Sequence, residues 1–95
     1  MEEQAKQVAE LLRLLANENR LLILCALLEK PLTAGELAQH TPGISLSALS
    51  QHLQVLRCAG LVAGEKSGQY ITYTLGDQRL RRVFAVLKEE YCPEK

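Results

Sequence analysis

Three cysteines, Cys25, Cys58 and Cys92, are the side chains of this sequence best suited to covalent chemistry. A thiolate can be oxidised, joined to a second sulfur or bound to a soft metal ion. Cys25 lies within the apolar run Leu21–Leu28, where a free cysteine most often acts as a small hydrophobic residue. Cys92 precedes Pro93 at the end of the last predicted helix, so we expect an exposed thiol there. The residues alone leave a structural role and a redox role open.

Groups for other kinds of catalysis are missing from the sequence. His40 and His52 have no evident nucleophile partner, and no glycine-rich phosphate-binding loop is present. We therefore expect neither an enzyme nor a bound cofactor. His52 falls between the apolar and polar faces of its predicted helix, which favours a partly buried, hydrogen-bonded histidine over a ligand or a base-reading residue.

A second chemistry is indicated by polar side chains on a helix predicted from about Leu46 to Ala59. At roughly 100° per residue, Ser47, Gln51 and Gln54 fall on one face, with Ser50 and Arg57 at its edge. Glutamine can form two hydrogen bonds with adenine, and serine can donate to or accept from any base. An ordinary solvated face is the alternative. We expect base contacts from Ser47, Ser50, Gln51 and Gln54, and a core face made of Leu46, Leu49, Leu53 and Leu56.

The segment 33–59 has the signals of two helices joined by a turn. Thr33 and Glu36 have the spacing of a capping box, which predicts a helix start. The segment 40–43 breaks this helix, because Pro42 moves the preceding residue out of the helical region. Ser45 is the expected N-cap of the second helix, and Gly60 is its stop signal. We predict a helix-turn-helix over 33–59.

The segment 61–75 predicts a two-stranded hairpin that turns at Ser67-Gly68-Gln69. Ile71, Tyr73 and Leu75 alternate with more polar positions, as in a half-buried strand. A hairpin after a helix-turn-helix makes a winged helix-turn-helix, a device for reading duplex DNA. A plain solvated turn is the alternative at the tip. We expect phosphate contacts from Arg57 and Lys66, and a phosphate or minor-groove contact from Gln69.

Two further helices are predicted near the ends of the chain, over 3–15 and over 77–92, the second with Asp77 as N-cap. Another helix follows Asn17 and is apolar throughout 21–28, so we expect it to be buried nearly all round. The stripes of the terminal helices could close the core of a monomer or pair with a second copy. Pairing would place two recognition helices in successive major grooves. The candidates for the seam of such a pair are Leu11, Leu12, Leu80, Phe84 and Leu87.

Length and composition limit the class of protein. Residues 1–95 are predicted to form a single domain, mainly α with a small β-hairpin: a winged helix-turn-helix of about five helices plus a two-stranded wing. The formal net charge is +0, so non-specific DNA affinity should depend on a few placed charges. No apolar run approaches the roughly 20 residues that span a bilayer, and no signal peptide is visible. We expect a cytoplasmic protein with no membrane contact and no permanent disulfide framework.

Several of these segments, taken together, resemble the ArsR/SmtB family. The resemblance covers nearly the whole chain in order and spacing. It implies a homodimeric winged-helix repressor that leaves its operator, a double-stranded DNA site, when a small inducer or oxidant binds. The matching runs are Asn17–Leu21, Ile23-Leu24, Gly35–Leu37, Ser50–Leu53, Leu56-Arg57, Ala59–Val62 and Tyr73–Leu75.

The resemblance extends to one sensing branch of that family. Metal-sensing members often carry Cys-x-Cys in the helix that corresponds to 35–39, or Asp-x-His where this chain has Asp77-Gln78-Arg79. Because both patterns are absent, we expect no metal site. Leu24-Cys25 and Tyr91-Cys92-Pro93 instead resemble the persulfide-sensing branch, in which reactive sulfur species link two such cysteines and DNA is released.

Other functions stay open at this point. Cys58 stands where family members often have an acidic residue, and its oxidation could interfere with DNA binding. A repressor that responds to arsenite or another soft metal could use cysteine thiolates. A winged-helix interaction module without a sensing role is the third reading.

Overall fold

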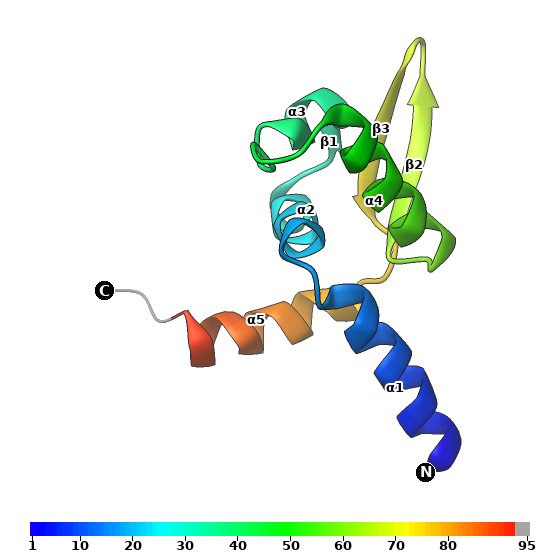
Figure 1. Ribbon diagram of the computed structural model, residues 1–95, viewed down its shortest axis with the longest axis vertical. Helices are drawn as coiled ribbons and strands as arrows, with labels where there is room; N and C mark the ends of the chain where they lie inside the picture. Colours follow the sequence, from blue (N-terminus) through cyan, green and yellow to red (C-terminus); the bar gives the residue numbers. More distant parts are fainter. Residues whose placement is uncertain (93–95) are drawn as a thin grey trace.

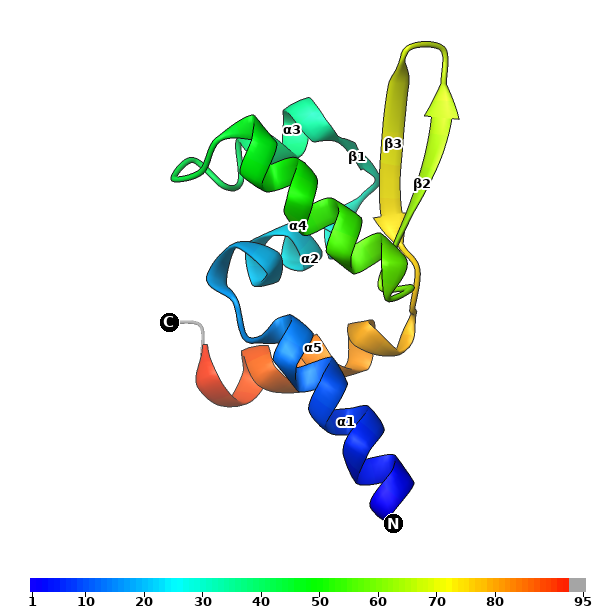
Figure 2. The same ribbon diagram turned by 45° about the vertical axis from the view of Figure 1, so that its right-hand side comes forward.

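The computed structural model describes residues 1–92, which form a mainly helical fold with a small antiparallel sheet (Figure 1). The elements are α1 (Glu2–Leu15), α2 (Glu18–Glu29), β1 (Leu32–Thr33), α3 (Ala34–Ala38), α4 (Leu46–Cys58), β2 (Val62–Ser67), β3 (Tyr70–Leu75) and α5 (Arg79–Tyr91). Helices α3 and α4 form the helix-turn-helix, and β2 with β3 forms the wing. Helices α1 and α5 lie at the end of the molecule opposite the wing tip (Figures 1 and 2). No helix within residues 1–92 is long and apolar enough to cross a membrane.

Capping bonds confirm three predicted helix starts. The side chains of Asn17 and Ser45 each accept a hydrogen bond from a backbone N–H three residues later, at 3.1 Å. Thr33 and Glu36 cap each other: the Thr33 backbone N–H donates to the Glu36 carboxylate at 2.9 Å, and the Glu36 N–H donates to Thr33 Oγ1 at 3.3 Å. Gly60 follows α4 with a φ of 79°, a left-handed conformation that ends a helix at little steric cost to glycine.

The start of α5 differs from the prediction, which made Asp77 its N-cap. Helix α5 begins at Arg79, and Gln78 before it makes no side-chain capping bond. Asp77 instead accepts three hydrogen bonds from Arg79, from its backbone N–H and its Nε at 3.0 Å and from its Nη2 at 2.7 Å. The guanidinium hydrogen bond holds the pKa of the Asp77 carboxyl below its usual range. The carboxylate therefore serves mainly as a partner for an exposed arginine.

The sheet has three strands in the order β1-β3-β2, where the sequence predicted two. Strand β1 consists only of Leu32 and Thr33, which pair antiparallel with Tyr73 and Thr72 of β3. Two residues are too few to show an alternating pattern, so this strand had no local sequence signal. The predicted alternation of β3 is confirmed where Tyr73 and Leu75 are buried.

The core lies between α2, α3, α4, the sheet and the first half of α5. On α4, Leu49, Leu53 and Leu56 are fully buried, as predicted. Leu46 was predicted to belong to the same core face, and this is wrong: its side chain is 69% exposed. Leu46 is the first residue of α4, and most of the loop that precedes it is also exposed. The core therefore ends before it reaches the first turn of this helix.

Helix α2 is not buried on all sides, so that prediction is also wrong. Ile23, Leu24 and Leu27 face the core, but Leu22 and Cys25 are exposed. An all-apolar stretch has no hydrophobic direction of its own, because every face carries similar side chains. The core elements cover one side of α2 and leave the side with Cys25 open.

Helix α5 divides its apolar residues between the core and the surface. Leu80 and Phe84 were predicted to form a seam between two copies, but they are buried in the core of the protomer. Their burial follows from the tight turn before α5, which brings its first two turns under the core. From the predicted seam, Leu12 and Leu87 remain exposed, and Leu11 is half-buried.

Gly60 and Gly76 meet at the base of the wing. The Gly76 backbone N–H donates to the Leu61 carbonyl at 2.8 Å. A Cβ atom on Gly76 would lie 2.5 Å from the Gly60 carbonyl oxygen, closer than non-bonded atoms can approach. This close approach holds the hairpin against the end of α4.

Candidate nucleic-acid interface and thiol pair

The outer face of α4 is polar and uncharged. The four residues predicted to read bases are all exposed, and their spacing of three and four residues puts them on one side of the helix. The buried leucines of α4 occupy the opposite side. This arrangement holds hydrogen-bonding side chains on a rigid element, facing outward. The residues are Ser47, Ser50, Gln51 and Gln54.

Arg57, at the end of this face, rests on the wing. Its guanidinium carbon lies 5.9 Å from the centre of the Tyr73 ring, a distance at which a cation is attracted to an aromatic face. Gly64 of β2 makes room for it, since a Cβ there would lie 3.0 Å from the same carbon. Arg57 is exposed, so its charge stays available at the junction of α4 and the wing.

The wing tip carries Lys66 and Gln69, both exposed, on either side of the turn. Gly68 in this turn has a φ of 65°, which favours glycine. The tip projects well away from α1 and α5 (Figure 1). The two predicted wing contacts are therefore presented on the most remote part of the hairpin.

Two exposed apolar residues of this surface were missed by the sequence analysis. Leu46 lies at the start of α4, and Tyr70, which is 64% exposed, begins β3 at the wing tip. The position of Leu46 directly after the N-cap was the available signal, because a first-turn residue can lie beyond the core. Tyr70 had a signal too, since it alternates with the inward-facing Ile71.

His52 is partly buried and hydrogen-bonded, as predicted. Its Nδ1 accepts from Arg20 Nε at 3.2 Å, and the Arg20 Nη1 also donates to the Leu14 carbonyl at 3.3 Å. Desolvation, followed by the Arg20 charge, lowers the pKa of His52. His52 therefore belongs to the support of α4 rather than to its outer face.

Cys25 and Cys92 are both exposed, one on the open side of α2 and the other directly after α5. Partial burial raises the pKa of the Cys25 thiol, the neighbouring Cys92 adds to the rise, and the Lys88 ammonium opposes it. The charge of Cys92 therefore reaches Cys25, and the two thiols lie in the same region of one protomer.

Cys58 lies apart from that pair. It is exposed at the end of α4, and Gln54 Nε2 approaches its sulfur at 3.8 Å. Within residues 1–92, no three or more His, Cys, Asp or Glu side chains gather as they would around a metal ion.

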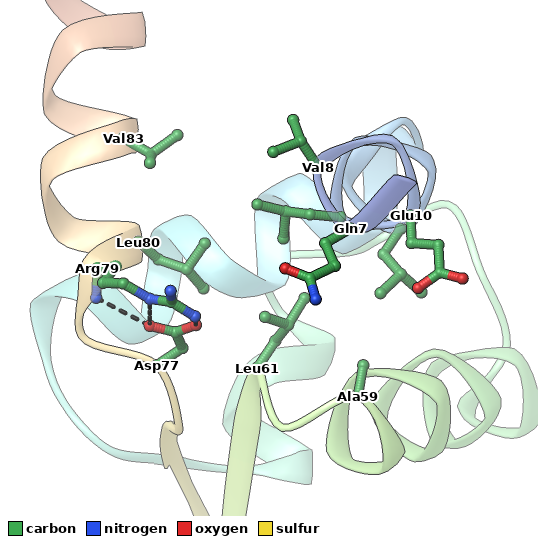
Figure 3. A pocket seen from close by; sticks show the side chains of 11 residues that line it. Gln7, Val8, Glu10, Ala59, Leu61, Asp77, Arg79, Leu80 and Val83 are labelled. Carbon is green, nitrogen blue, oxygen red and sulfur yellow. Dashed lines mark hydrogen bonds and ion pairs between the residues drawn. The ribbon is translucent and has the colours of Figure 1, made fainter. Parts of the chain in front are cut away.

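Helices α1 and α5 expose apolar side chains that have no partner in the protomer. Between the two helices lies a cavity of about 540 Å³, where Val8 of α1 and Val83 of α5 face each other above Leu61 (Figure 3). Almost the whole of α1 is exposed, and an isolated helix of this length is marginal in water. The exposed apolar residues of the two helices are Val8, Leu12, Val83, Val86, Leu87 and Tyr91.

The fold is that of a winged helix-turn-helix protein, and comparison with known proteins identifies its family. Residues 17–63 match the family described as bacterial regulatory protein, arsR family. The transcriptional activator HlyU of Vibrio cholerae is 42% identical over 92 residues, covering 97% of this chain and 84% of the relative. The chain belongs to the ArsR family and is a transcriptional regulator of the winged-helix type.

Solved structures agree with this assignment along nearly the whole chain. Reduced HlyU of Vibrio cholerae has a TM-score of 0.87 at 42% identity, covering 97% of this chain and 96% of the other. The transcriptional repressor BigR of Xylella fastidiosa has a TM-score of 0.89 at 35% identity, covering 99% and 95%. The homodimeric winged helix-turn-helix domain of Mb0332 from Mycobacterium bovis has a TM-score of 0.78 at 31% identity, covering 92% and 80%.

Proposed function

We propose that this protein is a homodimeric repressor that binds operator DNA in its thiol form and releases it when Cys25 and Cys92 become linked through sulfur. The observation that carries the proposal is the neighbouring, exposed position of these two thiols in a chain that also presents a polar recognition face. One end of the pair lies on α2, which packs against the recognition helix α4. A link between the thiols can therefore act on the DNA-binding surface.

In the proposed complex, α4 enters the major groove and the wing contacts the backbone. Ser47, Ser50, Gln51 and Gln54 meet base edges. Arg57, Lys66 and Gln69 lie on the rim of the same surface and contact phosphates or the minor groove. With so few cations, affinity depends on each of them.

We expect Gln51→Ala to weaken binding to the operator by about 1–3 kcal/mol and to relax the sequence preference at one base pair, because a glutamine side chain can make two bonds to one adenine. Lys66→Ala should lower the affinity for DNA of every sequence by the same factor and reduce the salt dependence of binding. The probe is a duplex that the parent protein selects from a randomised DNA pool, and affinity is measured by fluorescence anisotropy. If Gln51→Ala kept the affinity and the sequence preference of the parent, the assignment of this face of α4 as the base-reading surface would be wrong.

The proposed dimer forms through α1 and α5. These helices expose the apolar surface and cavity described above, which a second copy would cover. Burying this surface also supplies the partner that α1 lacks. The homodimeric state of the Mycobacterium bovis domain supports the same arrangement here. We assign the seam to Val8, Leu12, Val86 and Leu87, in place of the buried Leu80 and Phe84.

The proposed inducer is a reactive sulfur species or another thiol oxidant. A persulfide R–S–SH and the two protein thiols would yield the protein disulfide, the thiol R–SH and hydrogen sulfide, which balances atoms and electrons. Because partial burial raises the pKa of the Cys25 thiol and so disfavours its thiolate, we assign the closing step to Cys25 and the first attack to Cys92. A sulfur chain of greater length would relax the distance that a disulfide requires.

Treatment with glutathione persulfide should link Cys25 to Cys92 in most molecules and leave Cys58 unlinked, because only the first two thiols are neighbours. Intact-mass and peptide mass spectrometry after alkylation report this directly. Dimers of one isotope-labelled and one unlabelled copy distinguish a link within a subunit from a link between subunits. Linkage through Cys58 instead would refute the assigned pair. Arsenite added to the same assay tests the soft-metal alternative.

A further inference from the structure

Arg20 lies where the end of α1, the start of α2 and the middle of α4 meet. Its backbone N–H is capped by Asn17, its Nη1 donates to the Leu14 carbonyl at 3.3 Å, and its Nε donates to His52 Nδ1 at 3.2 Å. Arg20 and His52 are half-buried. A single guanidinium therefore joins three helices through directional bonds.

The bond to His52 depends on the protonation state of the imidazole. Nδ1 can accept only when the ring is neutral and carries its proton on Nε2. Protonation would place an N–H of His52 against the N–H of Arg20, so that two donors and two positive charges face each other. The Arg20 charge already lowers the pKa of His52, together with desolvation.

His52 is directly preceded by Gln51, so whatever holds His52 also sets the direction of the reading face. Apart from the contact of Arg57 with the Tyr73 ring, the other supports of α4 are packing contacts with α2, α3 and β2. Apolar contacts have little directionality, whereas a hydrogen bond prefers a narrow range of distance and angle. The Arg20 bond is thus suited to fix the rotation of α4.

We propose that Arg20 is a positioning residue that holds the recognition helix through neutral His52 at the angle required for DNA binding. This inference rests on the proposed binding of DNA by α4. It also connects α4 to α1, the helix assigned to the dimer, so that the spacing of the two recognition helices depends on the same residue.

The charged groups around this site are few. From α1, Glu10 and Arg13 line a groove of about 380 Å³ together with Arg20 and Val55. On α3, Glu36 is engaged in its own capping box. On β2, Glu65 and Lys66 lie in the exposed part of the wing. Among residues 1–92, Arg20 is the charge that shifts the pKa of His52.

The test is the pH profile of operator binding by the full chain, with the selected duplex as probe. Protonation of His52 in acid should cost the parent roughly fivefold in affinity per protomer, the equivalent of one hydrogen bond. Because the pKa of His52 is lowered in the folded protein, the loss of DNA affinity should occur at a lower pH than the titration of an ordinary histidine. Arg20→Gln should lose a similar factor already at neutral pH.

His52→Asn is the matched variant, because its amide oxygen can accept the Arg20 hydrogen bond but does not titrate. It should bind like the parent at neutral pH and keep its affinity in acid. Thermal unfolding of each variant checks that the chain is folded at the assay temperature. Parallel profiles for the parent and His52→Asn, or parental affinity in Arg20→Gln, would overturn the positioning role. A parent that selects no duplex, or whose binding ignores Gln51→Ala, would instead refute DNA binding by α4.

Discussion

Cys25→Ser and Cys92→Ser should each bind operator DNA as tightly as the parent but lose the response to persulfide. Serine keeps the size of the side chain and cannot join a sulfur link. In the parent, we expect treatment to weaken operator binding by about 5- to 150-fold, the range of typical coupling between two sites. Both cysteines are exposed, so neither substitution should disturb the core. The measurement is anisotropy titration with and without glutathione persulfide.

Cys58→Ser is the matched control for this prediction. Cys58 is also exposed but lies at the end of α4, away from the other two thiols. This variant should respond to persulfide like the parent. If both other variants still released DNA and Cys58→Ser did not, the switch would belong to Cys58 and would act by obstructing the DNA-binding face directly.

Phe84→Asp and Leu87→Asp, one helical turn apart on α5, should fail in different ways. Phe84 is only 4% exposed, so aspartate there would bury a carboxylate without a partner. The expected cost is ~4 kcal/mol or more, out of a total stability of about 5–15 kcal/mol for a natural domain. We expect Phe84→Asp to lose most of the stability of the fold. Leu87 is 41% exposed, so Leu87→Asp should fold and sediment as a monomer.

Circular dichroism and sedimentation velocity at micromolar concentration separate the two outcomes. The parent should sediment as a dimer, and Leu87→Asp should keep the helical spectrum of the parent. A monomeric parent would contradict the dimer itself. A folded, dimeric Leu87→Asp would instead remove this residue from the assigned seam and leave Val8, Leu12 and Val86 to be tested.

Elements with strong local signals could be predicted from the sequence. The cap residues Asn17, Thr33 and Ser45 lie next to the groups that they bind, so the helix starts followed from spacing alone. The polar face of α4 also followed from helical periodicity. The resemblance of ordered motifs to a known family extended these local signals to the whole fold.

The sequence predicted the buried apolar residues less well than it predicted the helix starts. Periodicity predicts the direction of a hydrophobic stripe but not where the core ends, so Leu46 was placed inside and Phe84 at a seam. The two-residue strand β1 is defined only by its pairing with β3. On α2, uniform hydrophobicity concealed the open side that carries Cys25.

The sequence by itself determined the helix-turn-helix, the hairpin and the side chains that α4 offers, because these depend on neighbours along the chain. Only the tertiary structure decided that Cys25 lies within reach of the charge of Cys92 and that Arg20 binds His52. Both pairs join residues that are distant in sequence, and their meeting depends on how the helices pack. The packing of the helices depends on how all the apolar surfaces together fill one small core. A local sequence pattern holds no information about this.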